Sequence, residues 1–474
     1  MTPAALRILD IKLFERGVVL RLPFRFGVVT LTACPQAFAK VRIRTETGRE
    51  EEGAAAELLA PKWFDKNLAL SNDDNFDQLR VSLQLAREAY LSDHGARTAF
   101  GHFAAHTKDQ TDAAAARGLN PLIAGFGPAL LDRAILDALC RALDMSFYKA
   151  IQGNVAGIDA KLTPDLEDFD LDRFLGALKP ARHIAVRHTV GLVDAITAAD
   201  LQNRVNDGLP ETLEEAIESY GCTYFKLKVS GVLDQDIARL GRIAAALDRL
   251  PHYAVTLDGN EQFPDAAAAT EFWRQVQSTP ELKRLAAATL YIEQPLPRAI
   301  TLHTDVTALA DATPVLIDEA DNTLDAFLEA TVQGYTGVSS KNCKGFYRSL
   351  LNAARCTKLN SGGSPRYFMS AEDLTTQAGL AVQQDLALVN LLGLTHVERN
   401  GHHYVDGFAG QDAGRTERQA FLIAQPGLYE TSGDNVRLAI RGGTLDLTSL
   451  SATGFASRAH PDWQTLQPIA LKAR

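Results

Sequence analysis

The order of apolar and polar positions divides the chain into two parts with different patterns. Segments 11–21 and 38–45 have the alternation of β-strands, and residues 76–150 then carry apolar side chains at helical spacing. Proline and glycine interrupt segment 22–27 between these strands, so we do not expect a central strand there. Strands followed by helices predict a separate α+β domain.

From about residue 185 short strands alternate with segments of helical length. Segment 223–230 is a predicted strand, and the apolar positions of 233–250 then mark one helix face. Further strands are predicted to end at Asp258, Glu293, Asp318, Lys341, Ser370 and Glu398. Parallel strands need such crossovers, and about eight strand–helix units close into a barrel. We therefore predict an α/β fold, a modified TIM barrel of the (β/α)7β type with an α+β capping domain.

Breaks in this rhythm predict the domain boundaries. An Asp-rich polar stretch precedes the barrel pattern, and the rhythm stops near residue 411, where a hairpin-like tail begins. The predicted division is a capping domain at 1–153, an insertion or linker at 154–184, the barrel at 185–410 and, at 411–474, a segment that returns to the capping domain.

Composition and charge narrow the class of function. The 474 residues are 46% hydrophobic and 22% charged, which is ordinary for a globular protein. The net charge of −10, with dispersed basic residues, argues against nucleic acid and anionic membranes as partners. The five cysteines are scattered without a CxxC motif, and there is no signal-peptide core or bilayer-length apolar segment. We expect a cytoplasmic protein that binds a small molecule.

Charged residues stand at strand ends where a strand packed on both faces should be apolar. They are Lys226 and Lys228, then Asp258, Glu293, Asp318 and Lys341, each about one strand–helix unit after the last. Any one alone would be an ordinary surface or capping residue. If all lie at carboxyl ends of adjacent strands, however, they meet at the barrel mouth, where active sites of this fold lie.

These residue types have a shared chemistry. Three carboxylates on neighbouring strands form an all-oxygen site, which suits Mg²⁺. Lysines on two sides of that ion could give and take protons. Lys226 and Lys228 share one face of their strand, and their mutual repulsion near a cation predicts a lowered pKa for both.

At these positions the sequence resembles the enolase superfamily, in the branch with mandelate racemase and muconate lactonizing enzyme. The motifs that carry the resemblance are Lys226-Leu-Lys228, Asp258-Gly-Asn260, Glu293-Gln-Pro, Asp318-Glu319 and Lys341-Asn-Cys-Lys344-Gly345. Their order and spacing agree with the family over about residues 220–375. The chain departs from the family at Ser339 and Ser340, where apolar residues are usual.

The resemblance implies a role for each matching residue. Asp258, Glu293 and Asp318 would bind Mg²⁺, with Mn²⁺ as a possible substitute. Lys228 and Lys341 would be bases on opposite faces of the substrate, and Lys226 would support Lys228 and help to bind the substrate carboxylate. The implied substrate contacts are Asn260 and Glu372 in the barrel, and Arg25 and Phe26 in the capping domain.

The implied reaction is Mg²⁺-dependent removal of the proton α to a carboxylate, giving a metal-stabilised enolate. Racemisation, epimerisation or dehydration of a small carboxylic acid would follow, and cycloisomerisation of the muconate type is an alternative. A Schiff-base lyase using Lys228 or Lys341, and a non-catalytic binder of carboxylates, also remain open. Family analogy allows a homo-oligomer, and His188, His402 and His403 have no assigned role.

Overall fold

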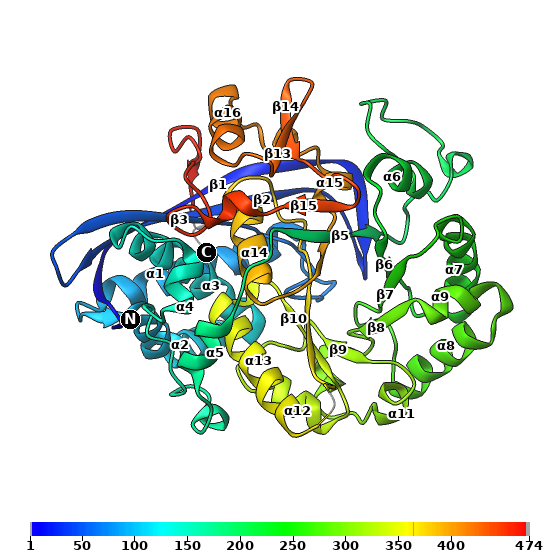
Figure 1. The fold of residues 1–474 in the computed structure, drawn as a ribbon, viewed down its shortest axis with the longest axis horizontal. Coiled ribbons are helices and arrows are strands. Elements are labelled where there is room, and N and C mark those ends of the chain that lie inside the picture. The colour runs from blue at the N-terminus through cyan, green and yellow to red at the C-terminus, as the bar shows by residue number, and fades with distance from the viewer. Residues whose placement is uncertain (1, 364, 471–474) are drawn as a thin grey trace.

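The computed structural model describes residues 2–363 and 365–470. Its first part is an antiparallel sheet covered by helices, drawn in blue and cyan in Figure 1. The strands are β1 (Ala5–Phe26), β2 (Val29–Thr45) and β3 (Glu50–Leu58), and with the C-terminal strand β16 (Gln467–Pro468) their order is β16-β1-β2-β3. The helices are α1 (Asn72–Ser92), α2 (Ala99–Ala115) and α3 (Pro121–Ala142). A short strand, β4 (Arg97–Thr98), pairs with β1.

Close packing joins this sheet to its helices. A Cβ on Gly53 of β3 would lie 2.2 Å from the Ala134 carbonyl oxygen of α3, so only glycine allows this approach. Strand β1 continues to Phe26, and among the described strands only β2 pairs with it beyond Val19, so this end is an edge and not a central strand, as expected. Its pairing with β2 shifts register between Val19 and Phe24, which accommodates Pro23 at an irregularity of the ladder.

The second part is a curled sheet of eight parallel strands, which confirms the predicted fold class. The strands are β5 (His183–Val190), β6 (Tyr224–Lys228), β7 (Ala254–Asp258), β8 (Thr289–Glu293), β9 (Val315–Ile317), β10 (Gly337–Ser340), β11 (Phe368–Ala371) and β12 (His396–Arg399). Their order is β11-β10-β9-β8-β7-β6-β5-β12. Strand β12 also contacts β11, which brings the two ends of the sheet together.

Helices connect successive barrel strands. They are α6 (Leu213–Tyr220), α7 (Leu233–Leu247), α8 (Ala266–Ser278), α9 (Lys283–Ala287), α10 (Arg298–Thr301), α11 (Thr307–Ala310), α12 (Ala326–Val332), α13 (Phe346–Leu359) and α14 (Leu380–Leu391). In α7 the buried residues Leu240, Ile243 and Leu247 recur every three to four positions, as expected for one face against a sheet. Among the described helices, none is long and apolar enough to cross a bilayer.

The remaining elements lie between and after these two parts. They are α4 (Phe147–Gln152), α5 (Leu171–Ala177), α15 (Gly401–Tyr404), α16 (Arg415–Ala424), β13 (Tyr429–Ser432), β14 (Asn435–Leu438), β15 (Thr444–Asp446) and β16 (Gln467–Pro468). The C-terminal segment contacts both parts: β16 pairs with β1, and β15 pairs with β5. Strand β15 joins β5 beside Ile184, before the pairing of β5 with β6 begins, so it supplies hydrogen bonds at an edge that would otherwise be open.

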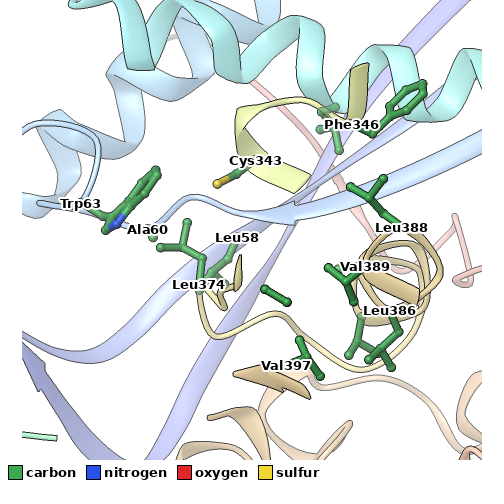
Figure 2. Packing of buried hydrophobic residues seen from close by; sticks show 14 of the residues in the cluster. Leu58, Ala60, Trp63, Cys343, Phe346, Leu374, Leu386, Leu388, Val389 and Val397 are labelled. Carbon is green, nitrogen blue, oxygen red and sulfur yellow. The ribbon is translucent and has the colours of Figure 1, made fainter. Parts of the chain in front are cut away.

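One apolar core runs from the sheet of the first part, which is called the capping part below, into the barrel. Figure 2 shows Leu58 and Trp63 of the first part beside Leu374, with Leu386 of α14 and Val397 of β12 below them. All five are buried. Helix α14 also donates a hydrogen bond from Gln384 to the Ala54 carbonyl of β3, at 2.8 Å. The first part is therefore packed tightly against the barrel.

Candidate active site

The charged strand ends meet inside the barrel mouth. Strand pairing places Lys228 of β6 beside Asp258 of β7, and Asp258 beside Glu293 of β8. Asp318 and Lys341 directly follow β9 and β10. All of these side chains are buried, none more than 6% exposed. Parallel strands that end at one edge explain the convergence.

Lys226 lies at the centre of this cluster. Its Nζ is 2.7–2.9 Å from carboxylate oxygens of Asp258, Glu293, Glu372 and Glu398. Burial alone would lower the pKa of Lys226, but these four carboxylates raise it well above its ordinary value. The expected lowering was therefore wrong for Lys226, because the anions around it outweigh its repulsion by Lys228.

Lys228 and Lys341 line the same cavity, one at the end of β6 and the other directly after β10. Lys228 is bound to Asp258, and Lys341 to Asp318. Each ammonium also faces an aromatic ring of the capping part: Phe26 at 5.9 Å from Lys228 and Trp63 at 4.4 Å from Lys341. Burial opposes the charge of Lys341, yet Asp318 raises its pKa above the ordinary value.

The two serines before Lys341 have clear contacts. The Ser339 hydroxyl donates to Asp318, and Lys344 donates to the Ser339 hydroxyl and carbonyl, both at 2.8 Å. Ser340 donates to Ser349 of α13 at 3.0 Å. Both serines therefore hydrogen-bond within the buried network, and Ser339 fixes the Asp318 carboxylate.

Asp258, Glu293 and Asp318 have the donor chemistry of a magnesium site. Burial first, and then the nearby carboxylates Asp258 and Glu372, raise the pKa of Glu293 well above its ordinary value. Such crowding of buried carboxylates is relieved by a divalent cation with oxygen ligands. Lys226 contacts Asp258 and Glu293, and Lys341 contacts Asp318, so the three carboxylates fit the ion by type and burial.

The cavity beside the lysines has an apolar roof and a polar floor. Its lining residues are Phe24, Phe26, Leu31, Ala60 and Trp63 from the capping part, and Lys228, Asn260, Lys341, Asp373, Leu374, Thr375 and Glu398 from the barrel. Phe24 stacks on Tyr404 of α15, with ring centres 4.2 Å apart, which holds the roof on the barrel. Asn260 has a φ of 40° and its backbone N–H donates to Asp258 at 2.9 Å.

Two residues expected at the substrate lie elsewhere. Arg25 is exposed, because the alternation of β1 turns its neighbours Phe24 and Phe26 inward and Arg25 outward. Glu372 lies below the cavity, where it pairs with Arg187 and accepts a hydrogen bond from Tyr291 at 2.9 Å. Neither side chain lines the cavity.

Sequence reasoning missed several residues of the site. Trp63 lies in a loop without periodicity, and Asp373 follows β11 beside the expected Glu372. Glu398 is the last residue but one of β12, and the sequence pattern had predicted a strand ending at this residue. His188 and His402 face one another at 2.9 Å outside the cavity, and burial lowers the pKa of both.

Comparison with known proteins gives the family. The family model described as enolase C-terminal domain-like matches residues 208–426, which include all the barrel residues of the cluster. The barrel belongs to the enolase superfamily. No curated protein sequence matches the chain.

Solved structures of enolase-superfamily proteins share the whole fold. A muconate lactonizing enzyme from Mycobacterium smegmatis, complexed with muconolactone, has a TM-score of 0.60 at 17% identity, covering 96% of this chain and 98% of that one. An enolase from Bradyrhizobium, complexed with magnesium and mandelic acid, has a TM-score of 0.57 at 16% identity, covering 96% of each chain. At such identities the likeness shows the fold alone.

Proposed function

We propose that this enolase-superfamily enzyme removes the proton α to the carboxylate of a small carboxylic acid, leading to racemisation, epimerisation or dehydration. The observation that carries the proposal is that two buried lysines from different strands, Lys228 of β6 and Lys341 directly after β10, line one cavity. A substrate between them presents one face to each amine. One lysine can then take the α-proton and the other can return it.

Asp258, Glu293 and Asp318 would hold Mg²⁺, or Mn²⁺ in its place. The bound ion supplies stabilisation for negative charge that develops on the substrate carboxylate. The Bradyrhizobium relative carries magnesium and mandelic acid together. In this chain Ser339 fixes Asp318 and the Asn260 backbone fixes Asp258, so the carboxylates are oriented before any ligand arrives.

Lys226 has a positioning role in this proposal. Its Nζ contacts four carboxylates and does not line the cavity, so it is poorly placed to reach a substrate proton. It instead fixes Asp258 and Glu293 relative to one another. Arg187 and Tyr291 hold Glu372 from the other side, so the support extends across the barrel to β5.

The roof favours a substrate with an apolar substituent. Five residues of the capping part cover the lysines with apolar side chains, and they offer no acceptors for a row of sugar hydroxyls. Such a roof also excludes water, which strengthens electrostatic interactions below it. We therefore place small carboxylic acids with apolar or aromatic substituents ahead of acid sugars.

Proton exchange tests the proposal. The full chain, treated with EDTA and then given Mg²⁺, is incubated in D₂O with mandelate-like acids, N-acyl amino acids, dipeptides and acid sugars, and NMR follows loss of the α-proton. We expect Mg²⁺-dependent exchange with at least one acid of apolar substituent. A panel without any exchange, or full exchange in metal-free enzyme, contradicts the proposal.

A further inference from the structure

We propose a second metal site in the capping part, in which Asp93, His102 and His106 bind a divalent transition-metal ion of the zinc class. Asp93 follows the last residue of α1, and both histidines lie on α2. Among the described residues, these three have ligand atoms that all lie within 4.8 Å of one another. The site shares no residue with the barrel cluster and does not depend on the proposed function.

The geometry suits one ion. His102 and His106 are four residues apart, so both imidazoles lie on the same face of α2. The Asp93 Oδ2 atom is 3.1 Å from His106 Nε2 and 3.8 Å from His102 Nδ1. Donors in a tetrahedral zinc site with bonds of about 2.0–2.1 Å are roughly 3.3 Å apart. Small side-chain rotations therefore suffice to bring all three onto one ion.

His102 offers an unused lone pair at this point. Its Nε2 lies 3.1 Å from the Leu6 carbonyl oxygen, which only accepts hydrogen bonds, so Nε2 carries the proton. The other nitrogen, Nδ1, is buried and has no hydrogen-bond partner, and the whole side chain is 0% exposed. Burial lowers the pKa of His102, which keeps the ring neutral. A buried acceptor without a donor is costly, and a metal ion would satisfy it.

Asp93 is held in place by its own partners. Its Oδ1 accepts from the Gly95 N–H at 2.9 Å, and Oδ2 accepts from Arg97 at 2.6 Å. A carboxylate oxygen has two lone pairs, so Oδ2 can keep the Arg97 bond and still ligate. Burial opposes its ionisation, but the hydrogen bonds from Arg97 and Gly95 lower the pKa of Asp93 to about 2.

This donor set selects the kind of ion. Two imidazoles and one carboxylate suit zinc and similar ions better than Mg²⁺ or Ca²⁺, which prefer oxygen ligands. His106 and Asp93 are partly accessible, which leaves room for a water as the fourth ligand. The ion would tie the end of α1 to α2 and, through the Leu6 carbonyl, to β1. To bind through Nε2, the neutral His106 ring takes the tautomer that carries its proton on Nδ1, which leaves the Nε2 lone pair free for the ion.

The test is a metal titration of the full chain with Mg²⁺ in large excess, which keeps the barrel carboxylates occupied. We expect one Zn²⁺ per chain by calorimetry and elemental analysis, and the visible absorption of four-coordinate Co²⁺ when Co²⁺ replaces it. The partly exposed ligands are changed singly, as His106→Gln and Asp93→Asn. The matched control is His252→Gln, at an exposed histidine of the barrel.

The site variants should bind Zn²⁺ at least about 10–100-fold more weakly, since even the loss of a partner outside the ligand set costs that much. Zn²⁺ should raise the Tm of wild type and His252→Gln but not of His106→Gln. Absence of stoichiometric Zn²⁺ binding by wild type, or unchanged affinity in both site variants, overturns the proposal. Circular dichroism shows whether each variant is folded before it is titrated.

Discussion

Two regions of the molecule each bury a carboxylate almost completely, but the pKa of the carboxyl group is lowered in one region and raised in the other. At the barrel mouth Asp318 is 0% exposed, and Lys341 and Lys344 hold its pKa below the ordinary value against the effect of burial. In the capping part Asp132 of α3 is 3% exposed, and its hydrogen-bond partner is the Tyr90 hydroxyl, at 2.7 Å. Burial raises the pKa of Asp132 to about 8.

The difference shows where the fold keeps charge. A buried carboxylate without a cation becomes neutral, whereas one beside lysines stays ionised. The barrel mouth therefore retains anions and cations together in the dry interior, which is costly unless every member is paired. The capping part contributes apolar cover and, at Asp132, an acid that is mostly neutral near pH 7.

Removing one charge from the barrel mouth should have the largest effect. Glu293→Gln leaves the shape of the side chain but removes one anion from the proposed metal site. We expect weaker Mg²⁺ binding and a loss of turnover of about 10²–10³-fold or more, as for other groups that stabilise developing charge. Isothermal titration and kinetics in D₂O measure both. The exposed Glu281→Gln is the control, and equal losses in both variants would contradict this assignment.

A change in the apolar roof should have a smaller and more selective effect. Phe26→Ala removes a buried ring, worth about 1.5–3 kcal/mol, or about 10–100-fold in kcat/KM for a substrate that packs against it. The neighbouring Arg25→Ala, at an exposed side chain, should stay within about twofold of wild type. A larger loss in Arg25→Ala than in Phe26→Ala would restore Arg25 to the substrate site.

The smallest expected effect is a pH dependence of stability that arises from Asp132, the neutral acid of the capping part. Because the folded pKa of Asp132 is raised, its contribution is complete below the ordinary Asp value and is lost as pH rises through about 8. Tyr90 and Tyr347 face it, and both phenols stay neutral because burial raises their pKa. The Tm of wild type should therefore fall more between pH 5 and pH 8.5 than that of Asp132→Asn.

The matched control for this experiment is Asp109→Asn, an exposed acid on α2. Its Tm should follow wild type across the same range. Parallel curves for wild type and Asp132→Asn would show that Asp132 is ionised in the folded protein, and the contrast with Asp318 would fail.

Local patterns were enough to predict the barrel and the strand ends that meet in it. Lys228, Asp258 and Glu293 each end a strand at regular intervals, and parallel pairing alone brings them together. The pKa of Lys226 could not be predicted in this way, because its partners Glu372 and Glu398 are 146 and 172 residues further along the chain. The direction of the Lys226 pKa shift depends on how the barrel closes, and the local spacing of residues in the sequence does not give this information.

The roof was the least predictable region for a similar reason. Segment 22–27 was expected not to be a central strand because of Pro23 and Gly27, and Arg25 was expected to face the substrate. In the structure β1 continues, so alternation decides which side chains face inward. Trp63 lies in an irregular loop, and its place over Lys341 follows from the docking of the capping part on the barrel.

The central claim is that Lys228 and Lys341 serve opposite faces of one substrate. The most direct measurement is deuterium incorporation into each enantiomer of an accepted acid by Lys228→Ala and Lys341→Ala. Removal of a general base typically costs about 10²–10⁴-fold in rate. We predict that each variant loses exchange with one enantiomer and retains exchange with the other, in reversed order. Wild-type rates with both enantiomers in both variants would contradict the account.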